Sequence, residues 1–341
     1  MLKLDDLSVD YHGIRVLHSF TLELAQSELL MLVGPTGCGK TTVLKAIAGL
    51  VRPASGEVRC ADWVANRHQT VAPEKRQVGM VFQDFALFPH LTVEENIFFR
   101  LKNPSVGEHW IDVLGLQGKR NSSPAQLSGG QKQRAALART LAHEPKIVLL
   151  DEPLSNLDEA LKDELRWVVR DSLKQAQVPA LWVTHDQAEA LSVGDRVGIM
   201  KDGCLEQLGT AQSCFASPAS RFVASFLGEA SFVTGRVASD TRAGDTKTAA
   251  TELGTVPIQA SLSGSVAVLF RPDDLRVVAD GTVNATLRWA RYEGAFWLYG
   301  AQLDSGVDVQ LRVNHEEEYL PGQRVALRAH TSEPLAVFAI S

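Results

Sequence analysis

The sequence predicts an α/β domain built on a buried parallel sheet, followed by a small antiparallel β domain. Short, almost continuously apolar runs are typical of strands covered on both faces, and four occur: 29–33, 78–82, 147–150 and 180–184. Segments 41–48 and 131–142 carry apolar residues at three- and four-residue spacing, as amphipathic helices do. Beyond about residue 232 the pattern changes to short alternating segments, which predicts strands of an antiparallel sheet.

The length of 341 residues exceeds one compact core of usual size, so two domains are expected. The first covers residues 1–230, and a short helical pattern that ends at Gly228 precedes its boundary. The second covers residues 231–341, where frequent Gly, Asp and Pro favour a sandwich or barrel. Its expected strands include 266–270, 282–292, 295–303, 307–313 and 324–329.

The composition excludes several classes of protein. The net charge of −6 is spread along the chain without a basic block, which disfavours nucleic-acid binding. No run of about 18 apolar residues is present, so we expect no membrane-spanning helix. Residues 1–13 include acidic side chains where a signal peptide needs an apolar stretch. The four cysteines contain no CxxC pair, so we expect a reducing compartment without disulfides or zinc.

The segment GPTGCGKTT at 34–42 predicts a phosphate-binding loop, because it satisfies GxxxxGK[ST] between a strand and a helix. Gly34, Gly37 and Gly39 allow a tight turn whose N–H groups point into one anion-sized hollow. Lys40 is expected on the β- and γ-phosphates of a nucleotide, and the Thr41 hydroxyl on Mg²⁺. We expect the whole loop to contact the nucleotide: Gly34, Pro35, Thr36, Gly37, Cys38, Gly39, Lys40, Thr41 and Thr42.

A second motif, IVLLDEP at 147–153, places two carboxylates at the end of an apolar strand. Asp151 can hold the water shell of Mg²⁺, and Glu152 can take a proton from an attacking water. Two adjacent acids alone would indicate a solvated turn, but the phosphate loop upstream favours the catalytic interpretation. Together the two motifs indicate a nucleotide hydrolase.

The segment LSGGQ at 127–131 narrows the class of hydrolase. Ser128 and the N–H groups of Gly129 and Gly130 can cap a helix and form a second anion site. With this motif just upstream of the Asp151 strand, the chain resembles the ATP-binding subunits of ABC transporters. The resemblance implies an α/β P-loop NTPase (ABC ATPase) fold. It also implies a head-to-tail homodimer in which the signature residues of one subunit contact the ATP of the other: Ser128, Gly129, Gly130 and Gln131.

Further positions match the family one by one. Gln83 in VFQDF resembles the Q-loop glutamine that senses Mg²⁺ and the attacking water, and Asp158 in SNLD resembles the D-loop residue at the dimer interface. His185 in VTHD resembles the switch histidine that contacts the γ-phosphate and orients the catalytic base. Tyr11 resembles the aromatic residue that stacks on adenine, with Val16 at its edge. The implied catalytic residues are Glu152, His185 and Gln83, and the implied Mg²⁺ ligands are Thr41, Gln83 and Asp151.

Between the Q loop and the signature, residues 84–130 resemble the helical subdomain that receives the permease in this family. Thr92 and Glu95 have the spacing of a capping box that opens a helix. A second helix is expected around 109–114, ending at Gly115. The subdomain is shorter than the family's usual pattern, which leaves the details of permease docking open.

A cassette followed by a small β domain resembles the ATPases of bacterial importers with a C-terminal OB-like (TOBE) regulatory domain. The runs RFVASFLGEA at 221–230 and LFRPDDL at 269–275 are similar to the ferric-iron and spermidine/putrescine branch. The run LGTVPIQ at 253–259 favours ferric iron. Spermidine/putrescine, phosphonate and sulfate are the alternative solutes. A soluble ABC ATPase of translation or DNA repair is the alternative outside transport.

The resemblance also implies ligands, partners and location. We expect ATP and Mg²⁺ as ligands, two transmembrane permease subunits or domains, and an indirect link to a solute-binding protein. We expect a peripheral protein on the cytoplasmic side of the inner membrane. Whether the β domain senses a ligand is left open. The cluster HEEE at 315–318 is more typical of a solvated turn than of a regulatory metal site.

Overall fold

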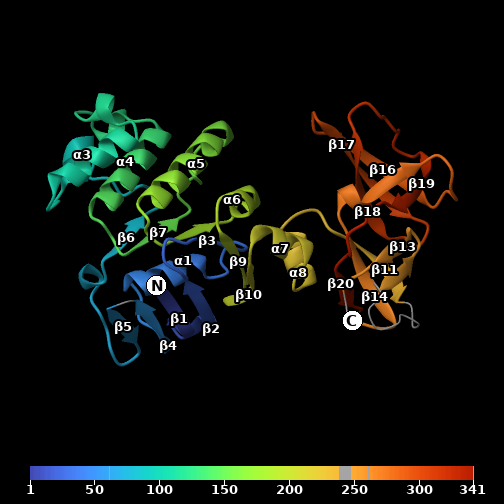
Figure 1. The fold of residues 1–341 in the computed structure, drawn as a ribbon, viewed down its shortest axis with the longest axis horizontal. Helices are drawn as coiled ribbons and strands as arrows, with labels where there is room; N and C mark the ends of the chain where they lie inside the picture. The colour runs from blue at the N-terminus through green and yellow to red at the C-terminus, as the bar shows by residue number, and fades with distance from the viewer. Residues whose placement is uncertain (61, 238–246, 260–261, 341) are drawn as a thin grey trace. The chain divides into compact units, whose positions relative to one another are not determined.

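The computed structural model describes residues 1–60, 62–237, 247–259 and 262–340. The chain divides into two compact units, Met1–Ala211 and Gln212–Ser341, each of which is visible in Figure 1. The sequence placed the boundary near residue 230 instead. The division comes earlier because helix α8 (Arg221–Phe226) and nearly all of α7 (Ala211–Ala216) belong to the second unit.

A six-stranded sheet of order β10-β9-β3-β8-β7-β6 forms the centre of the first unit. All of its strands are parallel except β10, which pairs with β9 in the antiparallel sense. Every residue of β3 and β8 is buried, which explains their continuous apolar runs. The strands are β3 (Leu29–Val33), β6 (Val78–Val81), β7 (Ile147–Asp151), β8 (Ala180–Thr184), β9 (Arg196–Lys201) and β10 (Cys204–Gly209).

A four-stranded antiparallel sheet of order β2-β1-β4-β5 belongs to the same unit. Its buried side chains, such as Leu4 and Phe20, join Leu30 of β3 and Leu44 of α1 in one hydrophobic core. This core fixes the antiparallel sheet beside the loop that follows β3. The strands are β1 (Leu2–Tyr11), β2 (Ile14–Leu24), β4 (Ser55–Cys60) and β5 (Trp63–Asn66).

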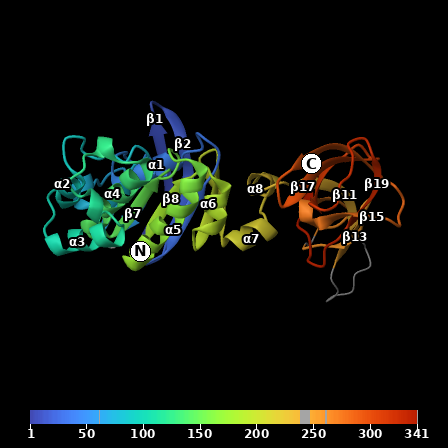
Figure 2. The ribbon, with the colours of Figure 1, turned by 90° about the horizontal axis from the view of Figure 1, so that it is seen from above.

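Four helices of the first unit, α1 to α4, follow the order that the sequence predicts, and α5 and α6 are additional. Helices α2, α3 and α4 lie together at one end of the unit (Figure 2). Thr92 and Glu95 form the capping box expected at the start of α2. Helix α3 begins earlier than expected, because the Asn103 side chain caps it by accepting the N–H of Ser105 at 3.2 Å. The helices are α1 (Lys40–Ala48), α2 (Val93–Phe98), α3 (Pro104–Val113), α4 (Gly129–Ala142), α5 (Glu159–Gln175) and α6 (Gln187–Ser192).

Two five-stranded antiparallel sheets, β13-β12-β11-β14-β20 and β15-β19-β16-β17-β18, form the second unit. Alternating apolar residues, including Val233, Phe270, Leu287 and Leu327, fill the core that they share. The predicted all-β fold is therefore confirmed. The strands are β11 (Ser231–Val237), β12 (Thr248–Thr251), β13 (Gly254–Pro257), β14 (Ser265–Phe270), β15 (Leu275–Val278), β16 (Ala285–Tyr292), β17 (Phe296–Leu303), β18 (Asp308–Asn314), β19 (Arg324–Ala329) and β20 (Val337–Ala339).

Residues 315–318 follow β18 in a turn, in which the Glu317 N–H donates to the Asn314 carbonyl at 3.0 Å. Within the described parts of the chain, no cluster of His, Cys, Asp and Glu has the arrangement of a metal site.

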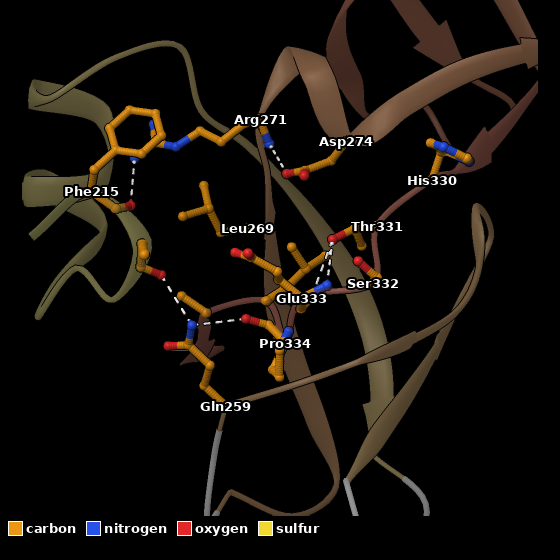
Figure 3. Close-up of a pocket in the computed structure, with 13 residues that line it drawn as sticks. Phe215, Gln259, Leu269, Arg271, Asp274, His330, Thr331, Ser332, Glu333 and Pro334 are labelled. Atoms are coloured by element: carbon orange, nitrogen blue, oxygen red, sulfur yellow. Dashed lines mark hydrogen bonds between the residues drawn. The ribbon is translucent and has the colours of Figure 1, made fainter. Parts of the chain in front are cut away.

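Arg271 attaches α7 and α8 to the sheets of the second unit, and Figure 3 shows its position beside Phe215 of α7. Its Nη1 atom donates to the carbonyls of Ala224 at 2.8 Å, Gly228 at 3.1 Å and Glu229 at 2.8 Å. The guanidinium also lies 4.1 Å from the centre of the Phe215 ring. Its Nη2 atom donates to the Phe215 carbonyl of α7 at 3.4 Å, so one buried side chain binds backbone carbonyls of both short helices.

Candidate functional site

The phosphate-loop motif, residues 34–42, runs from the end of β3 into the first turn of α1 at the carboxyl edge of the parallel sheet. Gly37 and Gly39 have φ angles of 85° and 104°, in the left-handed region that glycine adopts without strain. A Cβ atom at Gly39 would lie 2.9 Å from the Leu17 side chain of β2, so the close approach to that strand also requires glycine. The tight turn predicted from the motif is present.

Lys40 is a buried cation with 5% of its surface exposed. Its Nζ atom donates to the carbonyls of Gly34 at 2.7 Å and Pro35 at 3.0 Å. Among the described residues no carboxylate lies within 4.0 Å of this ammonium group. A buried charge without a counter-charge is costly, so the loop is suited to an anion such as a phosphate. The neighbouring Cys38 thiol is not activated, because burial raises its pKa.

Thr41 and Asp151 meet across the sheet edge. The Thr41 hydroxyl donates to Oδ1 of Asp151 at 3.0 Å. Burial raises the pKa of Asp151, and its hydrogen bond with Thr41 opposes this shift. A hydroxyl and a carboxylate oxygen are ligands that Mg²⁺ prefers, so the residues present at this position fit the expected ion.

Glu152 and His185 lie side by side at the ends of β7 and β8. The Nδ1 atom of His185 is 3.0 Å from Oε2 of Glu152. Glu152 itself has a φ angle of 45°, and its N–H donates to the Val183 carbonyl at 3.0 Å. The backbone of this residue is thus held in an uncommon conformation that directs its side chain toward the histidine.

Gln83 follows β6 at the same edge, where its side chain is exposed. Its carbonyl accepts a hydrogen bond from Nδ2 of Asn156 at 2.8 Å. No hydrogen bond in the described residues joins the Gln83 side chain to Thr41 or Asp151. The structure therefore places Gln83 on the edge of the site without bringing it to the other expected Mg²⁺ ligands.

The signature residues form the start of α4. Ser128 and Gln131 make a capping box, in which the Ser128 hydroxyl accepts the Gln131 N–H at 3.3 Å. Asp158 similarly caps α5 by accepting the Leu161 N–H at 2.9 Å. Within the described chain, no hydrogen bond connects either cap to the phosphate loop of the same molecule.

Tyr11 ends β1 and packs partly buried against the hydrophobic core. Val16 of β2 approaches the phosphate loop, since its carbonyl would lie 3.2 Å from a Cβ atom at Gly39. The antiparallel sheet therefore borders the loop at the position where the sequence expects the nucleotide base.

Two polar residues of the site were not predicted from the sequence. The motif SNLD indicates a functional role only for Asp158, so it does not single out Asn156. The sequence shows Arg139 only as part of a helical pattern, whereas in the structure its guanidinium contacts the segment after Gln83. The available signals were an amide inside a loop motif and an arginine within the mainly buried stretch 135–142 of α4.

Comparison with known proteins decides the family. An Fe(3+) ions import ATP-binding protein of Rhodococcus jostii is 36% identical over 339 residues, which cover 96% of both chains. The chain belongs to the ABC transporter ATP-binding proteins. A sulfate/thiosulfate import ATP-binding protein of Xanthomonas campestris is 39% identical, over 91% of this chain and 92% of its own. A spermidine/putrescine import ATP-binding protein of Pseudomonas fluorescens is 36% identical, over 88% and 86%.

The family profiles and solved structures agree with this assignment. The ABC transporter profile matches residues 17–155, and the TOBE domain profile matches residues 268–336. The dimeric ATP-binding cassette MJ0796, solved bound to ADP and Pi, has a TM-score of 0.55 and 30% identity. It covers 62% of this chain and 99% of its own. This ABC protein is therefore an ATP-hydrolysing transport ATPase with a C-terminal TOBE domain, as predicted.

A groove of about 400 Å³ opens next to the Q loop, between β6 and the helical subdomain. Phe99 in its wall is 41% exposed, and the Phe88 and Phe99 rings lie 4.7 Å apart. Its apolar wall is formed mainly by Val78, Met80, Phe82, Phe88 and Phe99. Within the described residues, no helix is both long and apolar enough to cross a membrane.

Proposed function

We propose that this ABC protein energises a bacterial importer by closing as a homodimer around ATP and hydrolysing it. The contact between His185 and Glu152 carries the proposal, because it places a carboxylate and an imidazole at the edge that presents the phosphate loop. A carboxylate in this position can act as general base toward a water near the γ-phosphate. The similar MJ0796 cassette was solved as a dimer bound to ADP and Pi, which supports the reaction and the assembly.

Each residue then has a defined task. Lys40 binds the β- and γ-phosphates, which supply the counter-charge that its ammonium group lacks. Thr41 and Asp151 would hold Mg²⁺, which would neutralise charge on the phosphate oxygens. Glu152 takes a proton from the attacking water, and His185 holds the Glu152 carboxylate in place. Gln83 orients that water from the adjacent strand end, so positioning and electrostatics provide most of the rate.

A second copy of the chain completes the site. Ser128 and Gln131 present the N-terminal end of α4, which is a site for an anion. Because this cap and Asp158 make no hydrogen bond to their own phosphate loop within the described residues, we assign them to the ATP of the partner copy. Head-to-tail pairing allows each signature to close on the nucleotide of the other subunit.

The groove beside Gln83 is the proposed docking site for the permease. Its wall combines exposed Phe99 with the partly buried β6 residues Val78 and Met80, as expected for a surface that receives an apolar helix. Its position next to the Q loop connects permease binding to the ATP site. We accordingly place this peripheral protein on the cytoplasmic side of the inner membrane, bound to two permease subunits or domains and indirectly to a solute-binding protein.

Ferric iron is the solute that we propose. The relative from Rhodococcus jostii aligns over 96% of both chains, and the run LGTVPIQ at 253–259 favours the same branch. Sulfate and spermidine/putrescine relatives match at 39% and 36% identity, so those solutes are the alternatives that an experiment must separate.

The test uses the transporter purified from native membranes through a tag on this chain and reconstituted in lipid. ATP hydrolysis is measured with ferric-loaded, sulfate-loaded and spermidine-loaded binding proteins. We expect a permease to co-purify and the ferric-loaded protein to stimulate hydrolysis. Stimulation by another loaded protein alone would replace the solute, whereas absence of any co-purified permease would contradict the import function.

A further inference from the structure

The segment that joins the Q loop to α2, residues 82–92, follows an unusual backbone path. Phe85 and Ala86 are consecutive and have φ angles of 64° and 45°. Side chains with a Cβ atom rarely occupy this left-handed region, and phenylalanine and alanine have no polar group that would favour it. Two such residues in succession persist only where surrounding groups hold them.

The Arg139 side chain of α4 supplies this support. Its Nη1 atom donates to the Ala86 carbonyl at 2.6 Å, and its Nη2 atom lies 3.3 Å from the Phe85 carbonyl. Its guanidinium carbon lies 5.5 Å from the centre of the Phe88 ring. The planar fork of an arginine can bind two adjacent carbonyls at once, whereas a lysine presents a single ammonium group.

The guanidinium of Arg139 has these two carbonyls as its hydrogen-bond partners. Among the described residues it has no carboxylate within 4.0 Å, in contrast to Arg134 of the same helix, which pairs with Glu164. Burial lowers the pKa of Arg139. A partly buried guanidinium without a carboxylate partner is bound instead by the two carbonyls, so the helix and the segment stabilise each other.

The same segment is tied to two other elements. At its start, Asn156 of the loop that follows Glu152 donates to the Gln83 carbonyl at 2.8 Å. At its end, Asn96 of α2 accepts the Phe88 N–H at 2.8 Å and donates to the Phe88 carbonyl at 3.1 Å. Three side chains, Arg139, Asn156 and Asn96, thus hold the segment between α4, the loop that follows Glu152 and α2.

We propose that Arg139 is a positioning residue that holds Phe85 and Ala86 in the left-handed turn and thereby links α4 and the groove to Gln83. The carbonyls of the turn move with α4, and Gln83 lies only two residues before Phe85. A movement of α4 on dimer closure would therefore shift Gln83 through the Arg139 side chain. A movement of the groove residues on partner binding would shift Gln83 in the same way. The link to the permease rests on the function proposed above, but the positioning of Gln83 does not.

The test separates positioning from simple packing by relieving the backbone strain. Arg139→Met is compared in the wild-type chain and in the Ala86→Gly background, because glycine adopts the left-handed conformation without the arginine. We expect Arg139→Met to lower kcat for ATP roughly tenfold in the wild-type chain, with KM changed less than about twofold. In the Ala86→Gly background the same substitution should lower kcat by no more than about threefold.

Hydrogen exchange of the isolated full-length chain gives a second readout. Arg139→Met should increase exchange at the Phe85 amide, which donates to the Phe82 carbonyl at 2.9 Å, and Ala86→Gly should reduce this increase. Arg134→Met, on the same helix, should change neither kcat nor exchange in residues 82–92. Arg139→Lys, which retains the charge without the fork, should resemble Arg139→Met.

Equal kcat losses in both backgrounds, with unchanged exchange at Phe85, would overturn the proposal. So would an Arg134→Met variant that matches Arg139→Met. If Arg139→Met does not fold, the Arg139→Lys pair in the two backgrounds decides the same question. These measurements need no permease, so a failure of the import function leaves their outcome intact.

Discussion

His185 Nδ1 lies 3.0 Å from Glu152 Oε2, although the two residues follow different strands. Strands β7 and β8 are parallel neighbours, and their register pairs Asp151 with Val183. The residues that follow each strand therefore emerge together at one edge. The left-handed backbone of Glu152 and its N–H bond to the Val183 carbonyl then fix the direction of the carboxylate. The backbone register thus determines the positions of Glu152 and His185 relative to each other. A catalytic base requires such preorganisation.

Glu152→Gln should abolish turnover while retaining ATP binding. The amide has the shape of the carboxylate but cannot accept the proton of the attacking water, so we expect kcat to fall by at least about 10²-fold. ATP-bound subunits should then accumulate as a closed dimer, seen by size-exclusion chromatography. The matched control is Glu159→Gln at the exposed start of α5, whose side chain is 72% accessible. Retention of more than roughly a few percent of wild-type hydrolysis would exclude Glu152 as the base.

Lys40→Ala should lose nucleotide binding itself. The ammonium group is held on the carbonyls of Gly34 and Pro35 with no carboxylate within 4.0 Å among the described residues, so its favourable partner is the phosphate. We expect the Kd for ATP to rise at least about tenfold, measured by nucleotide titration. The exposed Lys102→Ala serves as the control. An unchanged Kd for Lys40→Ala would show that the loop binds phosphate without this side chain.

Asp151→Asn should raise the melting temperature of the nucleotide-free protein near neutral pH. Burial raises the pKa of Asp151, so folding favours its protonated form over the carboxylate. This penalty is absent below the unfolded pKa and grows as pH rises from there through the folded pKa. The stabilisation by Asp151→Asn should therefore be larger at about pH 8 than at about pH 5.

Thermal unfolding in the presence of a chelator measures this effect, and Mg²⁺-dependent hydrolysis should be lost in the same variant. Asp84→Asn, at an exposed position, should leave the pH dependence of the melting temperature unchanged. A melting temperature of Asp151→Asn that falls below wild type at about pH 8 would mean that the Thr41 hydrogen bond outweighs the burial cost of the carboxylate.

The parallel sheet could be predicted from the sequence because its strands are buried on both faces. The apolar runs 29–33 and 180–184 coincide with β3 and β8 residue for residue. Motifs that follow such strands are carried to one edge by the topology, so the neighbourhood of Glu152 and His185 was also predictable. These inferences need only local patterns and the rule that parallel strands end together.

Contacts to backbone carbonyls could not be predicted in the same way. The hydrogen bonds from Arg139 to the carbonyls of Phe85 and Ala86 depend on a left-handed turn that neither residue type favours. No local sequence pattern therefore predicts them. Arg271 likewise binds carbonyls of α8, from which it is distant in sequence, within the unit that begins at Gln212. Hydrogen bonds between a side chain and a carbonyl distant in sequence leave no periodic pattern in the sequence. They are seen only in the folded chain.

Arg271→Met should loosen the attachment of α8 to the sheets of the second unit. The substitution keeps most of the buried volume but leaves the carbonyls of Ala224 and Glu229 without their 2.8 Å donors. Buried acceptors without partners are costly, so we expect the free energy of opening at these helices to fall by about 2–4 kcal/mol. Hydrogen exchange of the peptides that contain α8 and β14 measures this loss.

Arg276→Met on β15 is the matched control, because that arginine is exposed and is close to Arg271 in the sequence. Arg271→Lys should be intermediate, since one ammonium group retains charge but cannot reach the same set of carbonyls as the guanidinium fork. If exchange in α8 is equal in the Arg271→Met and Arg276→Met variants, the helix is held by its apolar contact instead. Ala224 packs against Leu269 and Ala336 in that contact, so it would then be the dominant attachment.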